Sequence, residues 1–159
     1  SIRINEAQAY GVAVKERSPG TSDFAGAYGV SLTLIPTGGQ LIYIVFADRN
    51  GNGVYDGTIA CETGVGAECV EKVTIARGNY IDSMCAVRSS GGDQCSSPRR
   101  ADISFLRPNL AARISLFTEG GSAYIPANMT GARLVFKSPK GRTRSVVIYY
   151  SGQISVQSQ

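Results

Sequence analysis

The segment from Asp48 to Asp56 carries oxygen-bearing side chains at a spacing that suits a calcium-binding loop. In an EF-hand-type loop, Asp48, Asn50 and Asn52 would fill the first, third and fifth positions. Val54 would offer its backbone carbonyl at the seventh position, and Asp56 stands at the ninth. These five residues are therefore candidate ligands of a weakly held Ca²⁺ ion.

The same segment departs from a calcium loop in ways that favour a simple turn. The twelfth position is Ile59, where a bidentate Glu belongs, and Arg49 lies among the acids. Glu62 follows closely enough to approach the loop. Asn-Gly pairs favour tight turns, and Asn and Asp side chains bond to their own backbone. Two interpretations stay open, a weak metal site and a turn that satisfies its own polar groups.

Positive charge is concentrated in the second half of the chain. Residues 1–80 carry eight acids and six bases, whereas residues 81–159 carry four acids and ten bases. After Glu119 there are five bases and no acid. Such a distribution is compatible with binding to a polyanion such as DNA, and equally with a basic face exposed to solvent.

The densest part of this basic region is the segment around Lys140, Arg142 and Arg144. On a strand, Arg142 and Arg144 would point to the same face. Tyr149 and Tyr150 follow in an apolar run and could stack on bases. The alternative is a hairpin turn flanked by arginines that keep it soluble.

The four cysteines form two close pairs along the sequence. Cys61 and Cys69 are eight residues apart, and Cys85 and Cys95 are ten apart, too far for a CxxC metal knuckle. Four cysteines allow three disulfide connectivities, and the short loops favour Cys61–Cys69 and Cys85–Cys95. An even number of cysteines without catalytic partners indicates an oxidising compartment.

The composition argues against an enzyme. The sequence has no histidine, which removes the commonest general base, the commonest zinc ligand and the Ser-His and Cys-His pairings. No pair of carboxylates stands out as an acid and a base. We therefore predict a protein without catalytic activity, resident cofactor or small-molecule substrate, apart from the Ca²⁺ considered above.

Regular elements that would position these residues can be read from the apolar pattern. Residues 1–18 show a rough helical stripe that ends at Pro19 and Gly20. The pattern then changes to short apolar or alternating runs separated by turn residues, which is typical of strands. These runs are residues 27–35, 41–48, 70–78, 79–87, 100–109, 112–120, 131–138, 144–152 and 153–157.

One helix followed by consecutive short strands predicts an α+β fold rather than alternating βαβ units. Strands joined by short turns should pair antiparallel, beginning with a hairpin of residues 27–35 and 41–48. The expected fold is an N-terminal amphipathic helix packed on antiparallel sheet. A length of 159 residues suits a single domain, with a β-rich head over residues 24–159.

Four segments taken in order resemble the FimT-like minor pilins and the H-type (GspH-like) minor pseudopilins of type II secretion. They are INEAQAYGVAVKE, GAYGVSLTL, YIVFADRNGNGVYD and KGRTRSVVIYYSGQISV. The first resembles the second half of the long pilin helix, and the second resembles the first strand. The third resembles a strand ending in a polar turn, and the fourth resembles the C-terminal hairpin.

The resemblance implies a ladle-shaped pilin-like domain and a structural role in a type IV pilus or a type II secretion pseudopilus. An apolar half-helix preceding this sequence would anchor the precursor in the inner membrane and later pack against other subunits in the filament core. The head would face the periplasm or the cell surface. In FimT-like pilins that take up DNA, a G-R-x-R motif resembles Gly141 to Arg144, which implies DNA binding by Lys140, Arg142 and Arg144.

Overall fold

The computed structural model describes residues 27–106 and 111–158, and the regular secondary structure in these ranges is almost entirely β-strand. Two three-residue 3-10 turns, η1 (Gly39–Leu41) and η2 (Ala76–Gly78), are the helical elements found within these two ranges. The predicted α+β class is therefore wrong, because the described chain forms two antiparallel sheets. The α assignment depended on a single segment, residues 1–18, which lies outside the described residues.

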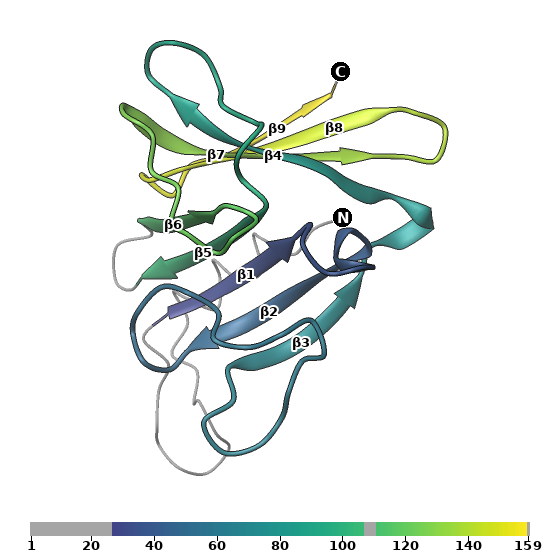
Figure 1. Ribbon diagram of the computed structural model, residues 1–159, viewed down its shortest axis with the longest axis vertical. Helices are drawn as coiled ribbons and strands as arrows, with labels where there is room; N and C mark the ends of the chain where they lie inside the picture. The colour runs from purple at the N-terminus through teal and green to yellow at the C-terminus, as the bar shows by residue number, and fades with distance from the viewer. Residues whose placement is uncertain (1–26, 107–110, 159) are drawn as a thin grey trace.

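The strands form two sheets that face each other (Figure 1). One sheet has five strands in the order β3-β2-β1-β5-β6, and the other has four in the order β4-β7-β8-β9. Each of the nine segments predicted to be a strand overlaps one strand of the structure. The strands are β1 (Ala27–Thr33), β2 (Ile42–Asp48), β3 (Cys69–Thr74), β4 (Tyr80–Arg88), β5 (Arg100–Leu106), β6 (Ala112–Phe117), β7 (Met129–Lys137), β8 (Thr143–Tyr149) and β9 (Ile154–Ser158).

The predicted first hairpin is confirmed, and its strands lie at the centre of the five-stranded sheet. β1 pairs antiparallel with β2, with Ala27 opposite Asp48 and Ser31 opposite Ile44. On its other side β1 pairs with β5. All seven residues of β2 are buried, because one face of the strand packs on the other sheet and the opposite face is covered by the loop that follows it.

The hydrophobic core lies between the two sheets. It joins Val30 of β1 and Ile103 of β5 to Met84, Leu134 and Ile148 of the four-stranded sheet, and all five side chains are fully buried. Burying aliphatic side chains of this size stabilises a fold by about 1.5–3 kcal/mol each. This shared core fixes the position of the two sheets and of the loops at their ends.

Gly29 allows a second, smaller cluster to form on the outer face of the five-stranded sheet. A Cβ atom at this position would lie 2.4 Å from the carbonyl oxygen of Ile103 and 2.8 Å from the ring of Phe46. Phe46 therefore lies across the bare backbone of β1 and packs against Tyr55 of the following loop, with ring centroids 5.6 Å apart. The loop is thus anchored to the sheet by aromatic contact.

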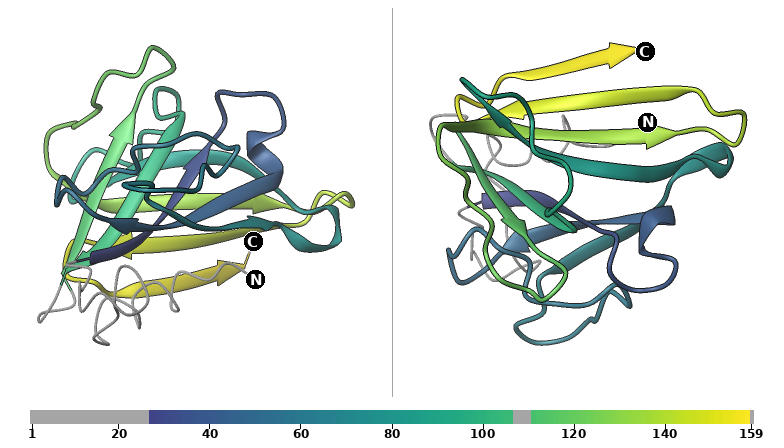
Figure 2. Two further views of the ribbon diagram at one scale, coloured as in Figure 1. Left: turned by 90° about the horizontal axis from the view of Figure 1, so that it is seen from below. Right: turned by 45° about the horizontal axis from the view of Figure 1, so that its top comes forward.

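The β7–β8 hairpin and the turn between β3 and β4 lie at the same end of the molecule (Figure 1 and Figure 2). The register explains this arrangement, because β4 pairs with β7 and Tyr80 lies opposite Lys137. Residues just before Tyr80 therefore come close to those just after Lys137, although about sixty positions separate them in the sequence. The candidate site described below lies at this end.

Candidate functional site

Asp48 organises the predicted calcium loop through its buried carboxylate. Its Oδ1 atom accepts hydrogen bonds from the backbone N–H groups of Gly51 (2.8 Å) and Asn52 (3.1 Å), and Oδ2 accepts one from Gly53 (2.8 Å). The Asp48 residue is 1% exposed. Arg113 of β6 brings Nη1 to 3.8 Å from Oδ2 and donates to the carbonyl of Gly51. Asp48 thus closes the turn that follows β2.

The other candidate calcium ligands are also engaged within the loop. The side-chain amides of Asn50 and Asn52 both donate to Oδ2 of Asp56, at 2.6 and 2.7 Å. Their own carbonyl oxygens accept from the backbone N–H groups of Asn52 and Val54. The side chains of Asp48, Asn50, Asn52 and Asp56 therefore all accept hydrogen bonds from N–H groups of the loop. Among the described residues, no group of three or more Asp, Glu, Cys or His side chains could hold a metal ion. The hydrogen bonds of Asp48, Asn50, Asn52 and Asp56 support the turn interpretation, and calcium binding by this loop stays a prediction.

Glu68 is a second buried carboxylate in this loop, and the sequence reasoning missed it. It is 4% exposed and accepts hydrogen bonds from the backbone N–H groups of Arg49 (3.0 Å) and Asp56 (2.8 Å). Arg49 in turn donates through Nε to the carbonyl of Ala67 (2.6 Å). Glu68 therefore joins the start of the loop to its end.

Glu62, which could have completed a metal site, binds its own neighbour instead. Its carboxylate accepts hydrogen bonds from the hydroxyl and from the backbone N–H of Thr58. These bonds, the hydroxyl bond first, lower the pKa of Glu62 to about 2. Burial, followed by the nearby charge of Glu62, raises the pKa of Tyr55 to about 12. Glu62 thus stabilises a small turn rather than approaching Asp48.

Asp102 of β5 ties the loop to the five-stranded sheet. Its fully buried carboxylate accepts hydrogen bonds from the hydroxyl of Ser31 (2.6 Å) and the backbone N–H of Tyr55 (3.0 Å). Arg100 forms an ion pair with it at 2.6 Å. Burial raises the pKa of Asp102, although Arg100 and Ser31 oppose that rise. The charges in this half of the molecule are therefore used to hold the structure together.

The predicted DNA-binding residues occupy a different place and have a different environment. Lys140, Arg142 and Arg144 line a groove of about 600 Å³ at the end of the β7–β8 hairpin. Arg77 and Lys137 also line it, so five cationic side chains meet there, and none of the described lining residues is acidic. We refer to this feature as the basic groove. Its lining residues are Arg77, Asn79, Phe136, Lys137, Ser138, Pro139, Lys140, Arg142 and Arg144.

Among the described residues, the side chains of the five groove cations form no hydrogen bond or ion pair with the protein, in contrast to three other arginines. Arg100 is paired with Asp102, and Arg133 is paired with Asp93 at 2.7 Å. Arg88 donates to two backbone carbonyls of its own loop. Within the part of the chain that the structure describes, no such hydrogen bond or ion pair involves the side chains of the five groove cations. Their charge is therefore available to a ligand.

A left-handed turn supplies the wall of the groove that faces the hairpin. Arg77 and Gly78 both have positive φ angles, 62° and 70°. A Cβ atom at Gly78 would lie 3.1 Å from Cγ of Pro139, which places the turn against the tip of the hairpin. The sequence reasoning did not assign Arg77 to the site. The local signal is Arg-Gly-Asn where the predicted segments 70–78 and 79–87 meet, which is typical of a turn but does not show what packs against it.

The two tyrosines considered for base stacking lie away from the groove. β8 runs from Thr143, next to the groove, to Tyr149 at its opposite end, and Tyr150 follows in the turn to β9. Burial raises the pKa of Tyr150. The aromatic residue that lines the groove is Phe136 of β7. Tyr149 and Tyr150 are therefore not placed to act together with Arg142 and Arg144.

The structure contains both disulfides that the short loops favoured. Cys61–Cys69 closes the loop onto the first residue of β3. Cys85–Cys95 links β4 to the polar loop that follows it. Each disulfide closes a segment without regular structure, and it stabilises the fold because it reduces the conformational freedom of the unfolded chain.

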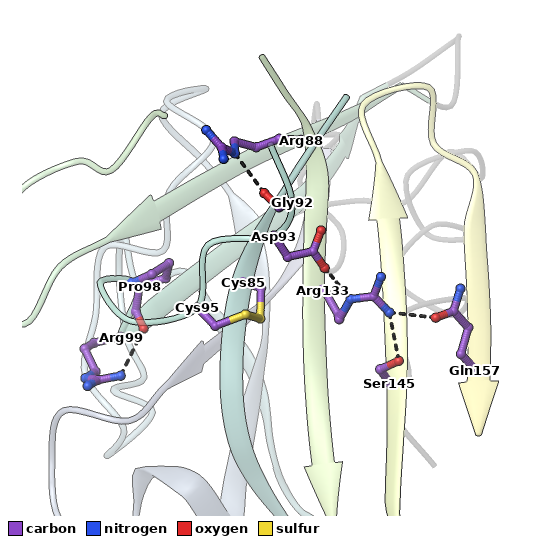
Figure 3. The surroundings of a disulfide bond; sticks show 10 residues. All are labelled: Cys85, Arg88, Gly92, Asp93, Cys95, Pro98, Arg99, Arg133, Ser145 and Gln157. Carbon is purple, nitrogen blue, oxygen red and sulfur yellow. Dashed lines mark hydrogen bonds and ion pairs between the residues drawn. A yellow bond between two sulfur atoms is a disulfide. The ribbon is translucent and has the colours of Figure 1, made fainter. Parts of the chain in front are cut away.

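Figure 3 shows how the second disulfide and an ion pair hold the loop that follows β4. Asp93 in that loop binds Nε of Arg133 at 2.7 Å. Arg133 also donates through Nη1 to Ser145 of β8 and to Gln157 of β9. Arg133 thus connects three strands of the four-stranded sheet, and it does not line the basic groove.

Comparison with known protein families, with curated proteins and with solved structures finds no match for this chain. Across the described residues, no helix has the length and apolar character needed to cross a membrane. The functional interpretation therefore depends on the residues and their geometry.

Proposed function

We propose that this chain is a non-enzymatic binding domain whose basic groove binds nucleic acid through its phosphates. One observation carries the proposal: five cations line a single groove, without an acid in its described lining and without a described protein partner. In contrast, Arg100 and Arg133 are each neutralised within the fold by an acid. A polyanionic ligand is the chemistry that complements the groove.

Binding of this kind is weak, salt-sensitive and independent of sequence. Lysine and arginine contacts to phosphates release counterions, so affinity falls as salt concentration rises. Such contacts position a nucleic acid but do not read its bases. Arg142 lies just before β8 and Arg144 within it, and both line the groove, so they can contact neighbouring phosphates of one strand.

The test is a fluorescence anisotropy titration of a labelled oligonucleotide at low salt. Replacing Arg142 and Arg144 together by Ala should weaken binding at least about tenfold, because two phosphate contacts are lost. Lys72→Ala is the matched control, since Lys72 is exposed on β3 and does not line the groove. Absence of binding by the wild-type protein at low salt, or equal loss in the control, would overturn the proposal.

A second candidate function is that of a structural subunit in a type IV pilus or a type II secretion pseudopilus. Its support is the ordered resemblance to minor pilins and pseudopilins, together with two disulfides that suit the periplasm or the cell surface. In that role the partners are other pilin or pseudopilin subunits, and the inner membrane holds the precursor. The two candidates are compatible, since a filament subunit can carry a DNA-binding head.

Filament membership is tested in the bacterium that makes the protein. The full-length precursor with an affinity tag should be recovered with filaments sheared from the cell surface, or with the pseudopilus after crosslinking. Recovery only as a free periplasmic protein would contradict the structural role while leaving the DNA-binding proposal intact.

A further inference from the structure

We infer that the basic groove takes a single-stranded nucleic acid, with one unstacked base against Phe136 and the adjoining phosphate between Arg77 and the hairpin cations. This inference depends on the proposed function and specifies its ligand. It adds two residues, Phe136 and Arg77, that phosphate binding by the Gly141 to Arg144 segment does not require.

Phe136 is placed to offer its ring to a ligand. It lies opposite Arg144 in the β7–β8 register, so the two side chains project from the same face of the sheet. Part of the ring packs against the main core, which fixes its position, and Phe136 also lines the groove. A rigid aromatic surface beside cations is the combination that single-strand-binding proteins use to stack bases and track the backbone.

The dimensions of the groove favour a single strand over a duplex. A volume of about 600 Å³ is in the range of pockets that enclose one small molecule. In a duplex the bases are stacked and paired inside the helix, so an aromatic side chain in a recess cannot reach a base face. A duplex could contact the exposed cations at the rim but would leave Phe136 unused.

Arg77 completes the site from the opposite wall. The residue holds a positive φ of 62°, a conformation that few non-glycine residues adopt. The turn that carries Arg77 packs against Pro139. Arg77 therefore lines the groove from the β3–β4 turn, whereas Arg142 and Arg144 line it from the β7–β8 hairpin. A phosphate in the groove is therefore flanked by cations on two sides rather than resting on a single basic face.

The first experiment compares ligands on the unmodified protein. Affinity is measured by anisotropy for a short oligothymidylate, an abasic oligonucleotide with the same number of phosphates, and a duplex of the same length. We expect the oligothymidylate to bind about tenfold more tightly than the abasic strand and more tightly than the duplex. Equal affinity for the oligothymidylate and the abasic strand, or preference for the duplex, overturns the inference but leaves phosphate binding standing. Failure of all three to bind overturns the proposed function itself.

The second experiment uses variants that retain the fold. Phe136→Leu keeps apolar packing but removes the ring, and it should abolish the difference between the oligothymidylate and the abasic strand. The sequence contains no Trp, so Phe136→Trp places a sole Trp fluorophore in the groove, and its emission should be quenched by the oligothymidylate only. A ligand preference unchanged in Phe136→Leu, or quenching by the abasic strand to the same extent, contradicts base stacking.

The contribution of Arg77 is tested with Arg77→Asn, because Asn tolerates a positive φ and carries no charge. Affinity for the oligothymidylate and the abasic strand should fall by a similar factor, with an unchanged unfolding midpoint, since Arg77 acts on the phosphate. Unchanged affinity for both ligands would remove Arg77 from the site.

Discussion

Replacing Asp48 by Ala should destabilise the protein much more than replacing an exposed polar residue of the same loop. The carboxylate accepts three backbone N–H bonds, from Gly51, Asn52 and Gly53. Gly53 is buried, so its unpaired N–H costs about 1–3 kcal/mol, whereas Gly51 and Asn52 are exposed and lose about 0.5–1.5 kcal/mol each. The free energy of unfolding should therefore fall by about 4 kcal/mol.

The assay is urea-induced unfolding at neutral pH with the disulfides kept intact. Asn50→Ala is the matched control, because Asn50 is exposed and its loss should cost about 1 kcal/mol or less. A loss in Asp48→Ala no larger than that of the control would refute the conclusion that Asp48 organises the turn.

A calcium titration of the wild type and Asp48→Ala distinguishes the two interpretations of the loop, a turn and a metal site. A ligand that binds the folded state stabilises it by about 2.7 kcal/mol at one hundred times its Kd. We expect no difference in unfolding free energy between millimolar calcium and a chelator. A clear gain in the wild type that disappears in Asp48→Ala would show that the loop rearranges to bind calcium.

Two further predictions concern stability. The pKa of Glu62 is lowered to about 2 from an ordinary value of 4.5, so its contribution is present above the ordinary value and is lost as the pH falls toward 2. Glu62→Gln should therefore reduce the dependence of the unfolding midpoint on pH in this range. Parallel curves of midpoint against pH for the wild type and the variant would mean that the contact with Thr58 contributes nothing. Gly29→Ala should lower the free energy of unfolding by about 3 kcal/mol, because its Cβ would meet the backbone of Ile103. Gly120→Ala has open space around its Cβ and should be nearly neutral. If chemical denaturation shows similar losses for both variants, the close approach at Gly29 is disproved.

The strands and disulfides could be predicted from sequence because both depend on local patterns. Alternating apolar residues set each strand, and a separation of eight or ten residues brings two cysteines within reach. The α+β class was wrong because a single N-terminal segment decided it. The regular structure of the described chain is two antiparallel sheets, and the order of their strands depends on long-range pairing that periodicity does not contain.

The chemistry of the polar loop could not be predicted from spacing alone. Asp48 stands where a calcium ligand would, but its oxygens are directed at backbone amides of the same turn. Glu68 binds the backbone N–H of Asp56, 12 residues before it in the chain. Asp102 binds the backbone N–H of Tyr55, 47 residues before it. Partners at that distance are supplied by the fold, and the sequence offers no signal for them.

The groove was predictable only in part. Lys140, Arg142 and Arg144 are adjacent in sequence, so their basic character is visible at once. Arg77 lies near them because β4 pairs with β7. Phe136 lies beside them because it is opposite Arg144 in the β7–β8 register. Both facts depend on strand pairing across many residues.

The most direct test of nucleic acid binding in the basic groove is the dependence of oligonucleotide affinity on salt concentration. Single-stranded binding loses affinity with a log–log slope of about 0.7 per neutralised phosphate, so five groove cations predict a slope of up to about 3.5. Replacing Arg142 and Arg144 by Ala should lower that slope by about 1.4, and Lys72→Ala should leave it unchanged. A slope near zero in the wild type, or one that the double substitution does not change, would contradict nucleic acid binding in the basic groove.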